Sequence, residues 1–219
     1  GIRTAVQTVS ARRLGQKKYS ECSEALYNGI ILASFIAIPF TIIGTVYANE
    51  IASLFLEDMA VISYCNDYLF IGYFSLIFVL IAFAFQGFYA GVEETRAHMV
   101  VTITSNVLNV YLNAGFIYGS EHINQYFTDM GLPWMSSLWS WAPFPALAVK
   151  GAAIATVISQ FLVFIIFVYV ILFKKRIYLT LNLKKFTFNK IHLFKIFKIG
   201  VPAALSMLIM SIGLFIYNI

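Results

Sequence analysis

Long apolar runs alternate with short polar connections along the chain. The runs predict membrane-spanning helices at residues 28–48, 67–90, 98–118 and 150–173, with partial helices at 1–14 and 199–219. Each of the four complete runs has about the 20 residues that an α-helix needs to cross the hydrocarbon core of a bilayer. The pattern therefore predicts an all-α, polytopic bundle of membrane helices.

The composition favours lipid over water as the surrounding medium. Hydrophobic residues make up 60% of the 219 residues and charged residues only 11%, whereas soluble domains are roughly 45–50% apolar and about 25% charged. Gly1 opens inside one apolar-rich helix and Ile219 closes inside another. We therefore expect the chain to be part of a longer membrane protein.

Basic residues gather in alternate connections between the predicted spans. Thirteen of the fifteen lie there: Arg12, Arg13, Lys17, Lys18, Arg96, Lys174, Lys175, Arg176, Lys184, Lys185, Lys190, Lys195 and Lys198. The positive-inside rule assigns these connections to the cytoplasm. Because the basic residues are divided among loops that adjoin spans, no nucleic-acid partner is expected.

Two connections have an unusual composition. Residues 119–149 are rich in Trp, Pro and Ser, which is typical of aromatic anchors at headgroup depth rather than of a further span. Residues 182–198 mix Phe, Ile and Leu with five lysines, which indicates an amphipathic segment in the cytoplasmic interface. An ordinary solvated loop is the alternative for this second stretch.

Five stretches resemble the multidrug and toxic compound extrusion (MATE) family, in the family's order. They are AVQTVSARRLGQKKYSEC, FQGFYAGVEETRAHM, SNVLNVYLNAGFIYG, PFPALAVKGAAIATVIS and KIGVPAALSMLIMSIGLFI. Each is weak alone, because small residues are common in packed membrane helices, but their order and spacing are specific. The resemblance implies an N-terminal six-helix lobe without its first helix over 1–181, a cytoplasmic inter-lobe linker over 182–198, and the start of the C-terminal lobe over 199–219.

Three asparagines give the helix at 98–118 a polar face. Asn106, Asn109 and Asn113 are three and four residues apart, so they lie on one side of it. From the residues alone, these amides either bond to neighbouring helices or line a site. By the resemblance, Asn109 and Asn113 match an N-x-x-x-D/N pair of the family, and Thr156 matches a threonine of its next helix. In some members these positions bind the coupling cation. The resemblance thus implies a cation or substrate site at these three residues.

Asn113 stands where those members have Asp. An amide oxygen can coordinate Na⁺, but the amide takes up no proton. No Asp or Glu lies deep within a predicted span, so a coupling carboxylate would come from outside this chain. Two further departures are Met210, at the place of a membrane-embedded Glu of some members, and Glu93, where the family often has Gly.

Arg3 is the unusual charge of the predicted spans. It lies nine residues before Arg12, or about 13 Å along a helix, and hence near mid-membrane. Gln7, one turn further on, extends a polar face. In one reading Arg3 and Gln7 face a central cavity, for which Asn106 is a third candidate. In the other, Arg3 extends to a membrane interface or pairs with a structural acid on another helix.

The resemblance implies a secondary active transporter and not an enzyme. It would export organic, often cationic, small molecules from a bacterium across the plasma membrane in exchange for H⁺ or Na⁺, without a further cofactor or metal. Membrane lipids are the other expected partners, and a monomer is the expected full-length state.

Two alternatives remain at this point. The nearest is a flippase for lipid-linked oligosaccharides from the same broader superfamily. Such a flippase would be expected to have several basic residues in the helices that line its cavity, whereas only Arg3 fits that description here. A membrane-embedded enzyme is disfavoured, since no span combines a nucleophile with a base or holds a metal-ligand cluster.

Overall fold

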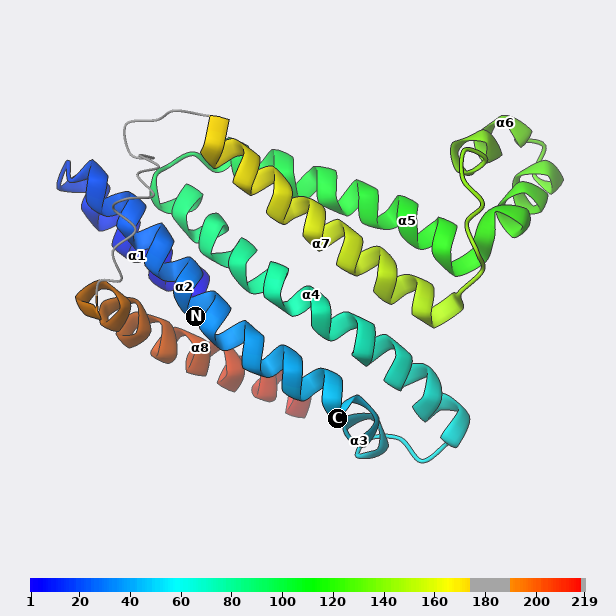
Figure 1. The fold of residues 1–219 in the computed structure, drawn as a ribbon, viewed down its shortest axis with the longest axis horizontal. Helices are drawn as coiled ribbons and strands as arrows, with labels where there is room; N and C mark the ends of the chain where they lie inside the picture. Colours follow the sequence, from blue (N-terminus) through cyan, green and yellow to red (C-terminus); the bar gives the residue numbers. More distant parts are fainter. Residues whose placement is uncertain (174–189, 218–219) are drawn as a thin grey trace. The chain divides into compact units, whose positions relative to one another are not determined.

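The computed structural model describes residues 1–173 and 190–217, and helices make up most of this part of the chain (Figure 1). In chain order the helices are α1 (Ile2–Gly15), α2 (Tyr19–Val46), α3 (Ala48–Ser53), α4 (Met59–Gly91), α5 (Thr95–Asp129), α6 (Pro133–Ser136), the 3-10 helix η1 (Ser137–Trp139), α7 (Ala148–Phe173) and α8 (Lys190–Tyr217). The all-α prediction is confirmed.

Within residues 1–173 and 190–217, five helices are long and apolar enough to cross a membrane: α2, α4, α5, α7 over Ala148–Val170, and α8 over Leu193–Tyr217. They coincide with the five predicted spans beyond the first partial helix. Their ends differ, because α2 begins at Tyr19, α4 begins at Met59 and α5 continues to Asp129. Hydropathy marks only the part of a helix in the hydrocarbon, whereas the backbone hydrogen bonds continue through the polar ends.

The helices form two compact units. The first unit contains residues 1–37 and 79–101 and the described part of 164–219; the second contains residues 38–78 and 102–163. Helices α2, α4, α5 and α7 each contribute residues to both units. The candidate site residues are therefore divided between the units, with Arg3 and Gln7 in the first and the asparagines and Thr156 in the second.

The first unit is built on close contacts between helix backbones. A Cβ added to Gly87 of α4 would lie 2.3 Å from the backbone oxygen of Arg3, and one added to Gly91 would lie 2.6 Å from that of Gln7. On α2, a Cβ at Gly29 would lie 2.4 Å from Cγ2 of Val6. Glycine at these positions lets α2 and α4 approach α1, as small residues do in packed membrane helices.

Aromatic rings fill the rest of this unit. Phe85 of α4 stacks on Phe167 of α7, with ring centroids 5.0 Å apart, and Tyr89 stacks on the same ring at 5.7 Å. All three side chains are buried. The beginning of α8 contacts α1, and Gly200 of α8 lies against Gly1 there. The residues of α8 from Leu205 onward are exposed.

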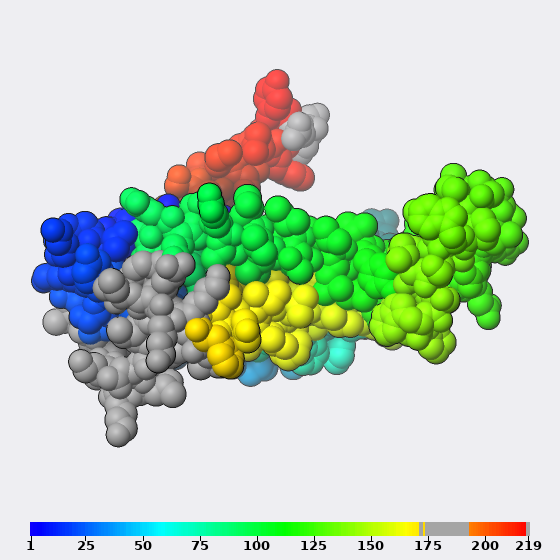
Figure 2. Space-filling view, turned by 90° about the horizontal axis from the view of Figure 1, so that it is seen from above, coloured from blue at the N-terminus to red at the C-terminus, as the bar shows by residue number. Residues whose placement is uncertain are grey.

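The second unit is centred on the contact of α5 with α7, which lie side by side (Figure 2). Leu112, Phe144 and Ala155 form its core. A Cβ at Gly151 would lie 2.2 Å from the backbone oxygen of Phe116, so α7 begins in direct contact with the backbone of α5. This contact fixes the position of α7 along the asparagine-bearing helix.

The connection 119–149 contains no complete membrane span, as predicted. It does contain helical structure, namely the end of α5, α6 and η1, and it is hydrogen-bonded to the main part of α5. Gly119 has φ 77° and ψ 156°, a conformation open to glycine, and it bends the chain within α5. Trp139 donates a hydrogen bond from Nε1 to the backbone oxygen of Tyr111 at 3.0 Å, and Ser120 Oγ lies 3.2 Å from the Trp139 oxygen. The tryptophan therefore ties the connection back onto α5.

The predicted interfacial segment 182–198 is only partly described. Residues 182–189 lie outside the described residues, and Lys190–Lys198 form the first turns of α8, continuous with its apolar part. The domain boundaries at 181 and 198 stay a prediction.

Candidate functional site

A pair of asparagine side chains forms the centre of the candidate site. Asn113 donates a hydrogen bond from Nδ2 to Oδ1 of Asn109 at 2.9 Å, one helical turn away on α5. Both residues are partly exposed, whereas Asn106, a turn earlier, is exposed. The predicted polar face thus divides into a linked pair and an exposed amide.

The amide oxygen of Asn113 is the unusual atom of this pair. Oδ1 is buried, and no hydrogen-bond donor among the described residues reaches it. A buried polar atom without a partner costs about 1–3 kcal/mol. An amide oxygen is also an acceptable ligand for a hard cation, so this atom fits one direct contact with Na⁺.

Thr156 lies on α7, the helix packed against this part of α5. Its hydroxyl donates to the backbone oxygen of Ala152 at 2.9 Å, and the preceding residue, Ala155, belongs to the core shared with Leu112. Among the described hydrogen bonds, none joins Thr156 to either asparagine. The structure therefore joins two of the three predicted site residues directly and leaves the third on the neighbouring helix.

Arg3 and Gln7 lie on an exposed polar side of α1. Ala5, Val6, Val9 and Ser10 form its buried side, and Arg3 and Gln7 are exposed one turn apart. This division agrees with the predicted polar face. A role of Arg3, Gln7 or Asn106 in a cavity stays a prediction.

Sequence reasoning missed an aromatic cavity in the second unit. A cavity of about 520 Å³ lies beside the bend in α5. Its lining consists of aromatic and apolar side chains and one imidazole: Ala114, Tyr118, His122, Ile123, Tyr126, Phe127 and Trp139. The available signal was the density of aromatic residues in the connection, but only the bend at Gly119 and the return of Trp139 bring them together.

No metal centre is apparent in the part of the chain that the structure describes. No group of three or more His, Cys, Asp or Glu side chains there is placed to hold a metal ion. Cys22 and Cys65 are both free thiols.

The part of the chain that the structure describes is thus a bundle of long apolar helices, which defines a polytopic α-helical membrane protein. A family model described as MatE matches residues 1–114, slightly more than half of the chain. The chain belongs to the MATE family. The resemblance of the five sequence stretches to this family is thereby confirmed.

Relatives among characterised proteins carry the name multidrug export protein MepA. The protein of Staphylococcus haemolyticus (strain JCSC1435) is 26% identical over 219 residues, which cover 97% of this chain and 41% of MepA. That of Staphylococcus saprophyticus is 27% identical over 217 residues, with the same shares. The chain thus spans about two fifths of the length of these relatives.

Two solved structures share the fold. An inward-facing multidrug resistance MATE family transporter of the MOP superfamily superposes with a TM-score of 0.77 at 20% identity, covering 98% of this chain and 43% of that one. A MATE structure in the bent conformation gives a TM-score of 0.76 at 21% identity, covering 98% and 42%.

These likenesses settle the broad assignments. The chain is an integral protein of the bacterial plasma membrane and belongs to a family of transporters, not of enzymes. The relatives are named as multidrug exporters, so the flippase alternative is not favoured.

Proposed function

We propose that this chain is one part of an exporter that expels small organic, often cationic, compounds in exchange for H⁺ or Na⁺. The MepA relatives support the export of drugs. The observation that supports ion coupling in this part of the protein is the buried, unpartnered oxygen of Asn113 beside Asn109.

In this proposal the asparagine pair supplies neutral oxygen ligands to the coupling cation. Asn109 holds the amide of Asn113 through its hydrogen bond, so the free oxygen is fixed in direction without a charge. Thr156 would join the site if its hydroxyl turned away from Ala152. Because amides do not titrate, the charge that balances the cation would come from a carboxylate beyond this chain.

The test is efflux of ethidium, a fluorescent organic cation, from energised cells that express the whole protein at matched membrane levels. We expect Asn109→Ala and Asn113→Ala to lose most of the gradient-dependent efflux, and Thr156→Ala to weaken it. Asn124→Ala is the matched control, since Asn124 is an exposed asparagine on the same helix. Collapsing the H⁺ and Na⁺ gradients separately identifies the ion.

Normal efflux in both Asn109→Ala and Asn113→Ala would leave these amides as contacts between helices and overturn the cation site. Asn113→Asp is a second probe, because it introduces a titratable carboxylate at the same position. We expect its efflux to depend more steeply on pH than that of the wild type.

A further inference from the structure

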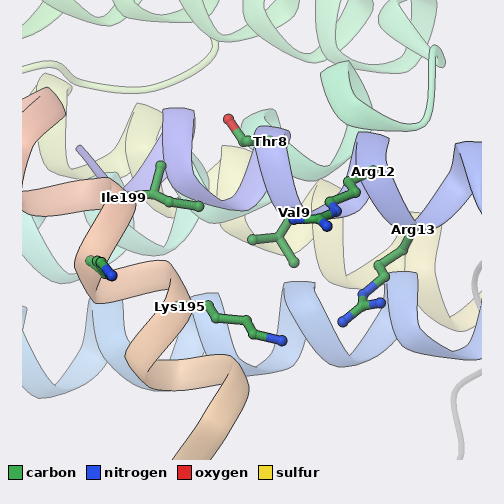
Figure 3. Close-up of a pocket in the computed structure, with 7 residues that line it drawn as sticks. Thr8, Val9, Arg12, Arg13, Lys195 and Ile199 are labelled. Carbon is green, nitrogen blue, oxygen red and sulfur yellow. The ribbon is translucent and has the colours of Figure 1, made fainter.

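A basic cavity lies in the first unit between the end of α1 and the start of α8. It has a volume of about 290 Å³, and four of its lining residues are cations: Arg12, Arg13, Lys195 and Lys198. Figure 3 shows the side chains of Arg12, Arg13 and Lys195 extending from the two helices toward the same space. The two helices are far apart in the sequence, so only the folded chain assembles this cluster.

Most of this positive charge lacks a counter-ion. Arg13 pairs with Glu21 at 3.0 Å and also donates to Gln16 Oε1. Among the described residues, no carboxylate lies within 4.0 Å of Arg12, Lys195 or Lys198. Three like charges around one small space repel one another, and an anion between them would relieve that repulsion.

The position of the cavity identifies the kind of anion. Arg12 and Arg13 lie in the last turns of α1, and Lys195 and Lys198 lie at the beginning of the apolar span Leu193–Tyr217. Cations at the ends of membrane helices lie at headgroup depth. Thr8 and two apolar side chains, Val9 and Ile199, complete the lining, and the apolar pair suits the glycerol and upper acyl region of a lipid.

The size of the cavity agrees with a headgroup. Pockets for drug-sized molecules have volumes of roughly 300–1,000 Å³, so a cavity of about 290 Å³ is just below that range and suits a smaller group. An organic cation would be repelled by the four basic side chains. We infer that the phosphate group of an anionic membrane phospholipid binds between α1 and α8, held by Arg12, Lys195 and Lys198, with its chains along Val9 and Ile199.

Native mass spectrometry of the purified whole protein tests this site. The protein is titrated with phosphatidylglycerol, with phosphatidylcholine of the same acyl chains, and with inorganic phosphate. We expect phosphatidylglycerol to bind more tightly than phosphatidylcholine. The double variant Lys195→Gln/Lys198→Gln should lose about fivefold in affinity for each charge removed, or roughly 25-fold in all.

The matched control is Lys17→Gln/Arg96→Gln, which removes two exposed basic charges outside the cavity. Its affinity for phosphatidylglycerol should change by less than about twofold, and Lys195→Arg/Lys198→Arg should retain binding because it preserves the charges. Equal affinity of the wild type for the two lipids overturns the proposal. So does an equal loss in the control variant, or displacement of the lipid by millimolar inorganic phosphate, which would indicate a site for a free anion.

Discussion

Single residues at helix C-termini show where the chain departs from the usual choice of amino acid. After α4, Glu94 N donates to the Tyr89 oxygen at 2.9 Å and Glu93 N approaches the Ala90 oxygen at 3.4 Å. This is the Schellman pattern, in which the residue at Glu93 adopts a left-handed conformation and is most often glycine. Glu93 has φ 64°, and Lys17 after α1 has φ 58°.

Glu93→Gly should stabilise the protein. A residue with a side chain in the left-handed region costs roughly 1–2 kcal/mol relative to glycine, and glycine relieves this cost. We expect an increase of about 1 kcal/mol in the free energy of unfolding, measured by denaturant titration in detergent. Glu93→Ala removes the same carboxylate but keeps the strain, so a gain of equal size in Glu93→Ala would refute this explanation.

Whole helices are positioned mainly by glycines whose role depends on their neighbours. Gly87 and Gly72 both belong to α4, yet a Cβ at Gly87 would meet the backbone of Arg3, whereas one at Gly72 would meet nothing within 4 Å. Sequence patterns predict the helix but not this difference, because it depends on which face α1 covers. The two glycines therefore make a matched pair.

Gly87→Ala should destabilise the protein by about 1–3 kcal/mol, since the oxygen of Arg3 belongs to a helix backbone and cannot turn aside. Gly72→Ala should be neutral or stabilising by about 0.5–1 kcal/mol, because alanine favours a helix interior over glycine. Thermal unfolding in detergent compares the two variants. A lower unfolding midpoint for Gly72→Ala than for Gly87→Ala would contradict the assigned contact.

At the scale of the whole molecule, the distribution of charge predicts how the chain crosses the membrane. Arg96 belongs to a connection predicted to be cytoplasmic, and Glu121 belongs to one of the intervening connections, which the same rule predicts to lie on the opposite side. Both residues are exposed. The prediction can therefore be tested by chemical access from one side of the membrane.

A membrane-impermeant maleimide should label Glu121→Cys in intact cells and should label Arg96→Cys only after permeabilisation. The background carries Cys22→Ala and Cys65→Ala, which removes both thiols of this chain, and any cysteine elsewhere in the whole protein is likewise replaced. Labelling of Arg96→Cys in intact cells would reverse the predicted orientation.

Features that depend on residues close together in the sequence could be predicted, whereas features that depend on residues far apart in the sequence could not. The spans and the asparagine face followed from local periodicity, and the link between Asn109 and Asn113 followed from their spacing of one turn. The polar ends of α2 and α5 were missed because apolarity stops before the helix does. The two cavities were missed because each needs residues from segments that only the tertiary fold brings together, such as Tyr118 with Trp139, or Arg12 with Lys195.

The backbone contacts of α1 with α4 have a mechanical consequence. At Gly87 the backbones of the two helices touch directly, and at Gly91 the nearest atoms of α1 are backbone atoms and Cβ of Ser10, so there is no layer of long, flexible side chains that could deform. A shift in register by one residue, which combines a slide of about 1.5 Å along the axis with a rotation of roughly 100°, would bring Phe88 or Val92 to the places that only glycine fits. We therefore expect α1 and the Gly87–Gly91 turn of α4 to move together as one rigid body in any rearrangement of the protein.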